Sequence, residues 1–175
     1  MQFTIYTQNN APKESKELLK SINNSIGFVP NIYSIMAESP LLLKAYKEIG
    51  KYFSESSFSS IEREVIEFTI NYINDCRYCI AAHYYFDKKA NFPKEIIEAL
   101  IENKVLPLKN LQVLKIITKQ IITNRGNLSE DDIQLFYSVG YSKIHLLELM
   151  IGVTHKTISN YLNHIAHTPI DDEFL

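Results

Sequence analysis

The sequence predicts an all-α fold, and three observations carry this prediction. Apolar residues recur mostly at spacings of three and four, which is the repeat of an amphipathic helix. Sustained alternation of apolar and polar residues, the pattern of a half-buried strand, is absent. Glycine is scarce, at 5 of 175 residues. With no composition shift or low-complexity tract along the chain, we expect one domain over residues 1–175.

The N-terminal part is expected to contain helices over residues 12–22 and 40–53. Residues 27–31 form a loop in this interpretation, and Pro30 suits the start of a helix, because its missing N–H is not needed there. Ser39 precedes the second helix, where its hydroxyl can accept a hydrogen bond from a free backbone N–H.

The central part is expected to consist of a serine-rich loop at 54–60 and a helix over 61–73. Ser59 followed by Glu62 fits a capping box, in which each side chain bonds the other residue's backbone N–H. Asn and Asp at positions 74–75 favour turns and N-caps, so the chain is expected to break there.

The C-terminal part contains the remaining expected helices, with ends marked by a proline, a serine cap and two glycines. They are predicted over residues 76–90, 93–103, 106–123, 129–140 and 142–166.

Composition and charge exclude several classes of partner. The chain is 46% hydrophobic and 22% charged, with a formal net charge of -2. No basic cluster suggests a nucleic acid or an anionic membrane surface, and no apolar run of about 18 residues suggests a membrane span. Residues 1–10 lack the pattern of a signal peptide, so we expect a cytoplasmic protein. In that reducing compartment, neighbouring cysteines are more often catalytic or metal-binding than structural.

The most informative segment contains Cys76, Cys79 and His83. Positions three, four and seven apart share one face of a helix, so these side chains are expected to project together. In the first turn of a helix, free N–H groups and the dipole favour thiolate over thiol, and the thiolate is the nucleophile. The second sulfur can resolve an oxidised first one, and His83 can accept the proton of Cys79.

Other interpretations of these three residues remain open. Cys, Cys and His are all zinc ligands, although a structural zinc site usually needs four ligands and no second C-x-x-C is present. The residues are also compatible with plain packing in a non-catalytic oligomeric module.

Glu64 is the next candidate for the site. It precedes Cys76 by twelve residues, about 18 Å along a continuous helix, but a reversal at 74–75 would bring it back beside His83. A carboxylate bonded to a histidine fixes its tautomer, which suggests a relay from Glu64 through His83 to Cys79. The alternative is a solvated helix face that Glu64 shares with Glu62 and Glu67.

The last predicted helix carries a polar stripe formed by Asn160, Asn163, His164 and His167. This stripe is either exposed or part of an interface, or it brings Asn160 or His164 to the cysteine pocket. His155 interrupts the apolar pattern of the same helix and is either a hydrogen-bonded core histidine or a pocket residue.

Longer stretches resemble the alkylhydroperoxidase AhpD-like group of the carboxymuconolactone decarboxylase superfamily, and within it the uncharacterised peroxidase-related branch. The resemblance is strongest at residues 62–65 and 74–83, which contain the pattern E-x11-C-x2-C-x3-H. Flanking segments that also resemble this branch are residues 27–31, 36–40, 124–126, 139–141 and 159–169.

The resemblance implies an AhpD-like helical bundle with the C-x-x-C at the N-terminus of a central helix, and subunits that associate as trimers or hexamers. It implies reduction of a small-molecule hydroperoxide, in which Cys79 attacks the peroxide oxygen and becomes a sulfenic acid. Cys76 then forms a disulfide, which an external thiol or dithiol protein reduces, while Glu64 and His83 relay protons. No cofactor and no metal ligand is assigned, and the cysteine pair argues against lactone decarboxylation.

One departure from the family's pattern concerns Tyr78. The best-studied members have a histidine at this place between the cysteines, whereas a tyrosine is a poor base near neutral pH. The resemblance therefore predicts weaker peroxide reduction or a different substrate, with Tyr78 as a pocket residue.

Overall fold

The computed structural model describes residues 3–175, which form nine α-helices and one short 3₁₀ helix. The helices are α1 (Lys13–Ile26), α2 (Asn31–Met36), α3 (Pro40–Ser54), α4 (Ser60–Ile73), α5 (Arg77–Lys89), α6 (Lys94–Ile101), α7 (Lys109–Thr123), α8 (Glu130–Ser138), α9 (Lys143–Ala166) and the 3₁₀ helix η1 (Asp172–Phe174).

The prediction of an all-α fold is confirmed, because the described residues contain no strand. Each expected helix is present, with ends that differ from the prediction by a few residues. The short helix α2 follows directly after Pro30, as the proline suggested, whereas η1 near the end of the chain was not anticipated.

The predicted caps explain where the helices begin. Ser39 Oγ accepts a hydrogen bond from a backbone N–H of the first turn of α3. Ser59 and Glu62 form the reciprocal capping box at the start of α4, and Ser129 and Asp132 form a second one at α8. These contacts satisfy N–H groups that would otherwise lack partners at each helix start.

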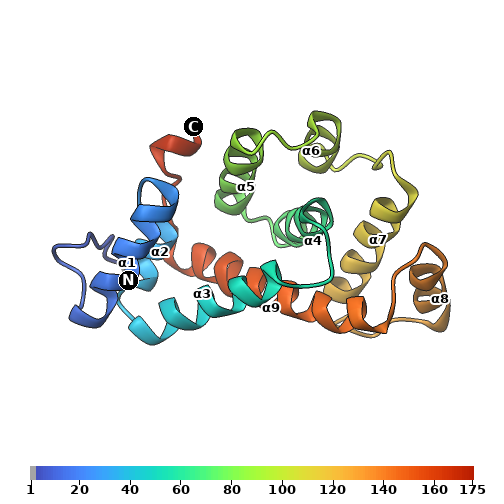
Figure 1. Cartoon of the computed structure of the whole chain (residues 1–175), viewed down its shortest axis with the longest axis horizontal. Helices are drawn as coiled ribbons and strands as arrows, with labels where there is room; N and C mark the ends of the chain where they lie inside the picture. The colour runs from blue at the N-terminus through green and yellow to red at the C-terminus, as the bar shows by residue number, and fades with distance from the viewer. Residues whose placement is uncertain (1–2) are drawn as a thin grey trace.

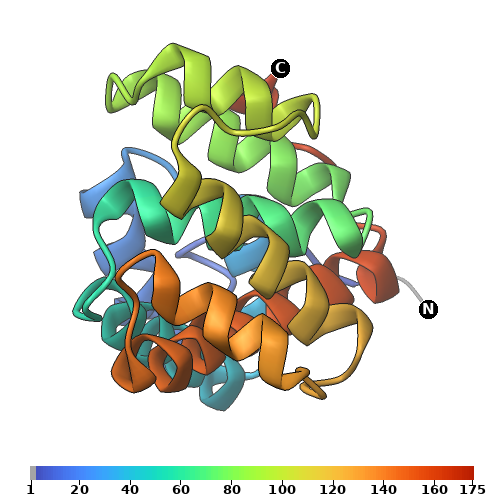
Figure 2. The ribbon, with the colours of Figure 1, turned by 90° about the vertical axis from the view of Figure 1, so that its right-hand side faces the viewer.

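Helix α4 occupies the centre of the molecule (Figure 1), where it packs against α7, α9 and α5. Figure 2 shows α7 lying across α4. Because neighbours cover α4 on several sides, even the polar side chains of its second half are buried, among them Glu67, Thr69 and Asn71.

The buried apolar residues form two clusters, and the cysteines lie in one of them. The first cluster is built on α4, α6, α7 and α8, and the second joins α1, α2, α3 and the start of α5 with the C-terminal tail. Helix α9 borders both, through Ile151 on the first and Ile158 on the second. The junction between the clusters is where polar side chains of α4, α5 and α9 meet.

Two glycines allow α3 and α9 to approach closely. A Cβ added to Gly152 would lie 2.7 Å from ring carbons of Phe53, and one added to Gly50 would lie 2.9 Å from Nε2 of His155. Real contacts of this kind are longer, so each glycine leaves the space that an aromatic ring of the facing helix fills.

In the described residues, no helix is both long and apolar enough to cross a lipid bilayer. The segment 1–10, for which no signal peptide is predicted, begins with residues 1–2, which lie outside the described residues.

We predict that Gly152→Ala lowers the free energy of unfolding by about 1–2 kcal/mol. Overpacking against buried Phe53 costs about 1–3 kcal/mol, and the better helix propensity of alanine offsets up to about 1 kcal/mol of it. Urea denaturation measures the change. Phe53→Leu should cost less in the Gly152→Ala background than alone, because the smaller side chain relieves the contact. A variant as stable as the parent protein would contradict this close packing.

Candidate active site

The chain reverses between α4 and α5 as the Asn-Asp pair predicted. Asn74 ends α4, Asp75 adopts a left-handed conformation with φ 49°, and Cys76 is the N-cap of α5. The reversal makes the two helices neighbours and brings Glu64 back to His83, whose Nδ1 lies 2.8 Å from Glu64 Oε2. The expected contact between these two residues is therefore present.

Cys76 and Cys79 are both buried, and both are free thiols. Cys76 Sγ accepts the backbone N–H of Cys79 at 3.4 Å and so caps the helix that carries its partner. Two amide groups of α9 point at the Cys79 sulfur: Asn160 Nδ2 lies 3.0 Å away and Asn163 Nδ2 lies 3.2 Å away. Donated hydrogen bonds of this kind favour the thiolate over the thiol.

Asn160 is held in place by two further amides. It donates to Asn71 Oδ1 at 2.9 Å and accepts from Asn74 Nδ2 at 2.9 Å, and both of these residues belong to the end of α4. Its donor toward Cys79 therefore has a fixed direction. The structure brings Asn160 to the sulfur, as one interpretation of the polar stripe proposed.

A buried lysine that the sequence analysis did not single out lies at the centre of the site. Lys156 of α9 is 3% exposed, and its Nζ lies 2.7 Å from Nε2 of His83. An ammonium group can only donate, so Nε2 accepts and the ring proton sits on Nδ1, where it is donated to Glu64. His83 thus contacts Lys156, and no direct hydrogen bond from His83 to Cys79 is found in the described residues.

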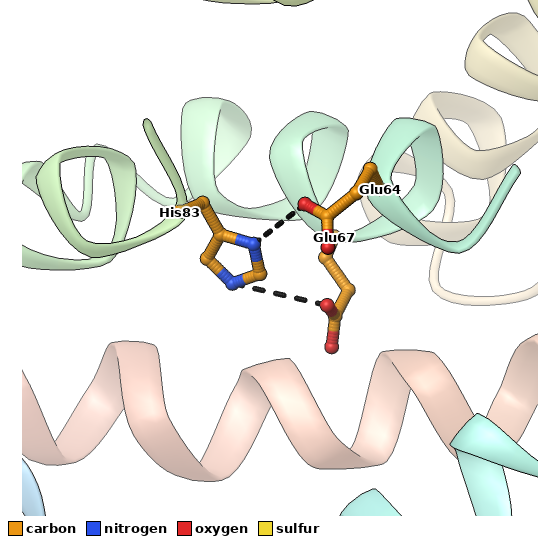
Figure 3. Close-up of side chains that lie close together, drawn as sticks. All are labelled: Glu64, Glu67 and His83. Atoms are coloured by element: carbon orange, nitrogen blue, oxygen red, sulfur yellow. Dashed lines mark hydrogen bonds and ion pairs between the residues drawn. The ribbon is translucent and has the colours of Figure 1, made fainter. Parts of the chain in front are cut away.

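A second carboxylate, Glu67, approaches the other nitrogen of the His83 ring. Figure 3 shows Glu64 and Glu67 on the same side of the ring, with Glu64 near Nδ1, and the Oε2 of Glu67 is 3.8 Å from Nε2. The other oxygen of Glu67 is 3.0 Å from Nδ1 of His155, whose ring stacks on Tyr46. His155 is thus a hydrogen-bonded, half-buried residue that also lines the pocket described below, which combines the two interpretations of this residue.

The charges around Lys156 set the pKa values of the site. Burial by itself raises the pKa of the Cys79 thiol, but the hydrogen bond from the Cys76 thiol and the Lys156 charge outweigh it and hold the pKa well below its ordinary value. The pKa of Cys76 is raised, first by its hydrogen bond to Cys79 and then by burial. The two sulfurs are therefore unequal, with Cys79 the thiolate and Cys76 the thiol.

Lys156 and Glu67 both keep their charges. Burial lowers the pKa of Lys156, but the negative groups Cys79, Glu67 and Glu64 raise it above its usual value. Burial raises the pKa of Glu67, yet Lys156 and His155 hold it below its usual range. The pKa of the lysine is raised and that of the glutamate is lowered, because these buried groups of opposite charge stabilise each other. We call these charges the ion cluster.

Asp87 follows His83 by one helical turn and is also buried. Burial and the neighbouring Glu64 raise the pKa of its carboxyl group. The raised pKa, about 7, leaves this carboxyl group partly protonated near neutral pH and so reduces the negative charge beside Glu64.

Cys79 and His83 line a cavity of about 200 Å³. Its polar wall includes Glu67, Lys156, Ser159 and Asn163. The rest is largely aromatic and apolar, and consists of Pro30, Ile32, Tyr33, Tyr46, Tyr78, Ala82, Phe86, His155 and Phe174. The Cys79 sulfur thus faces a small cavity that has one charged wall and otherwise consists largely of apolar and aromatic side chains.

Tyr78 lines this cavity. Its hydroxyl links α5 to two other segments of the chain by hydrogen bonds, and we call this arrangement the Tyr78 clasp. The hydroxyl donates to Asp171 Oδ2 at 2.6 Å and accepts the backbone N–H of Ile32 at 3.2 Å. Asp171 also accepts the backbone N–H of Asn31. Burial and the Asp171 carboxylate raise the pKa of Tyr78, so this side chain ties α5, α2 and the C-terminal tail together rather than serving as a base.

His164 does not reach the cavity, although the polar stripe suggested it as a pocket residue. It is exposed and lines a separate surface groove with Asp75, Cys76 and His167. Helical geometry puts position 164 about 40° from Asn160 and about 100° from Asn163, at the edge of the buried face of α9.

The geometry does not favour the zinc alternative built on both cysteines and His83. In the described residues, the cluster with metal-ligand spacing consists of Glu64, Glu67 and His83, whose ligand atoms lie within 4.8 Å of one another. The Lys156 ammonium is bonded to that same histidine, and its positive charge opposes a metal ion there.

Sequence reasoning missed Lys156 and Glu67 as site residues. Lys156 lies four residues before Asn160 and seven before Asn163, so helical periodicity puts it on the polar face that these amides share. Glu67 lies three residues after Glu64, on the same side of α4. The periodicity was therefore a usable signal, and it was hidden by the general rule that charged residues face solvent.

Comparisons with known proteins connect this site to a family. The model of the carboxymuconolactone decarboxylase family matches residues 40–110, which include Glu64, both cysteines and His83. None of the curated proteins compared with the chain matches it.

Solved structures share the fold over nearly the whole chain. The alkylhydroperoxidase AhpD core protein from Ralstonia eutropha JMP134, described as an uncharacterized peroxidase-related protein, has a TM-score of 0.86 and 17% identity over 99% of this chain and 93% of that one. An uncharacterized peroxidase-related protein from Silicibacter sp. TM1040 has a TM-score of 0.84 and 21% identity, covering 99% and 92%.

A third similar structure is the debrominase Bmp8, as a cysteine-to-alanine variant in complex with 2,3,4-tribromopyrrole. Its TM-score is 0.83 and its identity 14%, covering 99% of this chain and 94% of that one. Together, the family match over residues 40–110 and the shared helical fold support a relation of this chain to the AhpD-like proteins of the carboxymuconolactone decarboxylase superfamily.

Proposed function

We propose that this protein is a thiol-dependent hydroperoxide reductase that works in the reducing cytoplasm. One observation carries the proposal above the others: the Cys79 sulfur faces a cavity, receives two amide hydrogen bonds, and is stabilised as a thiolate by Lys156. Thiolates at such sites are the nucleophiles of redox enzymes.

In the first step, the Cys79 thiolate attacks the terminal oxygen of a hydroperoxide, ROOH. A sulfur–oxygen bond forms, the oxygen–oxygen bond breaks, and the products are a sulfenic acid and an alkoxide, RO⁻. The alkoxide needs a proton. Lys156 is the donor on the cavity wall, and Nε2 of His83, which Glu64 orients, holds it by accepting its hydrogen bond. Lys156 regains its proton when reduction of the disulfide returns Cys79 as a thiol that then ionises.

In the second step, the Cys76 thiol attacks the sulfenic sulfur of Cys79. A disulfide forms, and the hydroxyl group leaves as water with the thiol proton. A dithiol protein then reduces the disulfide by exchange and supplies two electrons for each hydroperoxide. Cys79 is the better leaving group because its pKa is the lower, so the external thiol is expected to attack Cys76.

The charges at and behind the cavity wall indicate the class of hydroperoxide. Glu67 and the Cys79 thiolate line the cavity and Glu64 lies behind His83, so that three negative charges stand against the positive charge of Lys156. An anionic substrate is therefore disfavoured, while aromatic walls favour an apolar group. A small neutral hydroperoxide with an aromatic or alkyl group fits this site best.

A second candidate is reductive dehalogenation of a small aromatic ring. The rings of Tyr33, Tyr46 and Phe86 line the cavity beside the nucleophilic sulfur, and Bmp8 is a debrominase whose structure holds a tribromopyrrole. The same thiol pair would supply two electrons, replacing one halogen by hydrogen as halide leaves and the disulfide forms. A turnover assay with 2,3,4-tribromopyrrole and a dithiol distinguishes this candidate from the first.

We predict that Cys79→Ser lowers turnover of cumene hydroperoxide at least a hundredfold, about the least that loss of an essential group costs. Cys76→Ser should fail in steady-state turnover but still release one cumyl alcohol per chain in a single turnover. Its sulfenic acid is then detected by mass after dimedone labelling. Full turnover by Cys79→Ser would mean that another group is the nucleophile, and no turnover by the parent protein would reject the proposed function.

The pH dependence of Cys79 alkylation should report the Lys156 charge. Because the pKa of Cys79 is lowered, its alkylation rate should reach a plateau below the ordinary thiol pKa of about 8.5. Lys156→Met removes the cation that favours the thiolate, which raises this pKa. The midpoint of the rate profile should then move up from about 5 by about one pH unit or more, because a nearby opposite charge shifts a pKa by that amount. Lys115→Met, at a partly exposed lysine remote from the cavity, is the control and should leave the profile unchanged.

Tyr78→Phe separates a structural clasp from a catalytic role. The variant should lose about 1–3 kcal/mol of stability, because a buried hydroxyl with two partners disappears. Its hydroperoxide turnover at low temperature should stay within a few-fold of the parent protein, since the hydroxyl contacts neither sulfur. A loss of turnover comparable to that of Cys79→Ser, with stability unchanged, would assign Tyr78 to the chemistry.

A further inference from the structure

The 3₁₀ helix η1 brings an aromatic ring to the active-site cavity. Figure 1 shows η1, the red turn beside the C-terminus, next to α5. Phe174 in this turn is only 8% exposed, although the following residue, Leu175, is 90% exposed. Four aromatic rings surround it, with centroids 5.4–5.8 Å from its own, and they belong to Phe28, Tyr78, Tyr85 and Phe86. Tilted and edge-to-face contacts of this kind hold a ring in a defined place.

Phe174 lines two separate spaces. One is the active-site cavity of about 200 Å³. The other is a groove of about 400 Å³ between α5 and α6, whose lining includes Ile80, Tyr84 and Ile101, and we call it the outer groove. Among the described residues, Phe174 is the one that belongs to both linings. The two spaces therefore approach each other at its side chain.

Elsewhere, α5 itself separates the cavity from the outer groove. Positions 78, 79, 82, 83 and 86 share one face of this helix and line the cavity, whereas positions 77, 80, 81 and 84 share the other face and line the groove. The backbone of a helix is a wall that no substitution removes. The Phe174 ring, in contrast, is a part of the wall whose size depends on a single residue.

The segment just before Phe174 is anchored on both sides of the cavity. Asp171 accepts hydrogen bonds from the Tyr78 hydroxyl of α5 at 2.6 Å and from the backbone N–H of Asn31 at 2.9 Å. The side-chain amide of Asn31 also donates to the carbonyl of Pro169 at 3.1 Å. The Tyr78 clasp thus fixes the chain three residues before the ring, so Phe174 is a positioned wall and not a loose side chain.

We propose that Phe174 determines substrate size: its ring closes the cavity toward the outer groove and limits the apolar group that can reach the Cys79 sulfur. For hydroperoxides this inference rests on the function proposed above, but the same limit applies to any electrophile that the thiolate attacks. The closed cavity is smaller than the roughly 300–1,000 Å³ of sites for drug-sized ligands. A smaller residue at position 174 would join the cavity to the groove and admit larger groups.

Alkylation of Cys79 with reagents of different size tests the limit without any enzymatic turnover. In a Cys76→Ser background, Cys79 is the one remaining cysteine. Its rates with N-ethylmaleimide and with the bulky N-(1-pyrenyl)maleimide are each divided by the rate with free cysteine. The background protein should favour the small reagent. Phe174→Ala should raise the relative rate of the pyrenyl reagent at least about tenfold, because even one methylene group in an apolar pocket is worth about 10–200-fold.

Phe28→Ala is the matched control. Its ring lies 5.7 Å from the Phe174 ring, but Phe28 lines neither the cavity nor the outer groove, so the ratio of the two rates should stay unchanged. Circular dichroism confirms that each variant keeps its helices, and Phe174→Leu replaces Phe174→Ala if the latter does not fold. A background protein without size preference, a ratio that the Phe174 variants leave unchanged, or an equal change in Phe28→Ala would overturn the proposal.

A hydroperoxide assay separates this size limit from the proposed chemistry. With a dithiol as reductant, kcat/KM is compared for cumene hydroperoxide and the bulkier triphenylmethyl hydroperoxide. Phe174→Ala should raise the relative kcat/KM of the bulkier substrate at least about tenfold, for the same reason. If the parent protein reduces neither hydroperoxide, the proposed function is rejected, and the alkylation ratio still decides the role of Phe174. If the alkylation ratio does not respond, the size limit is rejected even where both hydroperoxides are reduced.

Discussion

The burial of the Lys156 ammonium is the constraint on which the rest of the site depends. A charge that is 3% exposed is costly to remove from water unless negative groups surround it. Here Glu67 and the Cys79 thiolate supply negative charge directly, while Glu64 acts through the His83 ring. The same lysine therefore fixes the tautomer of His83 and the ionisation of Cys79. Its position on α9 also explains why this helix must lie between the two core clusters.

The helical framework places these charges by simple means. A left-handed Asp75 reverses the chain, which puts Glu64 and His83 on facing helices. Gly50 leaves room for His155, which in turn holds Glu67. Neither Asp75 nor Gly50 takes part in the chemistry. Asp75 brings α5 beside α4, and Gly50 allows α3 and α9 to approach closely. The ion cluster therefore lies where these four helices meet.

The parts that the sequence predicted depend on local physics. Capping boxes, turn residues and helical periodicity act over a few residues, so the helices and the reversal at 74–75 were predictable, and with them the Glu64–His83 contact. The clasp from Tyr78 to Asp171 joins residues 93 positions apart, and no local pattern reports such a contact. Lys156 was missed for another reason: its burial depends on partners from two other helices, α4 and α5, and a charge in a sequence is ordinarily assigned to solvent. The polar stripe of α9 divides in a way that its sequence did not decide, because Asn160 and Asn163 are buried whereas His164 and His167 are exposed.

The N-cap role of Cys76 ties the first turn of α5 to the oxidation state of the protein. In the dithiol form its sulfur accepts the backbone N–H of Cys79, one of the groups that a helix start leaves without a partner. In the proposed disulfide that sulfur would bond Cys79 Sγ, and the amide would lose this acceptor. Tyr78 lies between the two cysteines, and its hydroxyl ties the C-terminal tail to α2. The proposed oxidation would therefore remove a helix cap directly beside the residue that anchors one wall of the cavity.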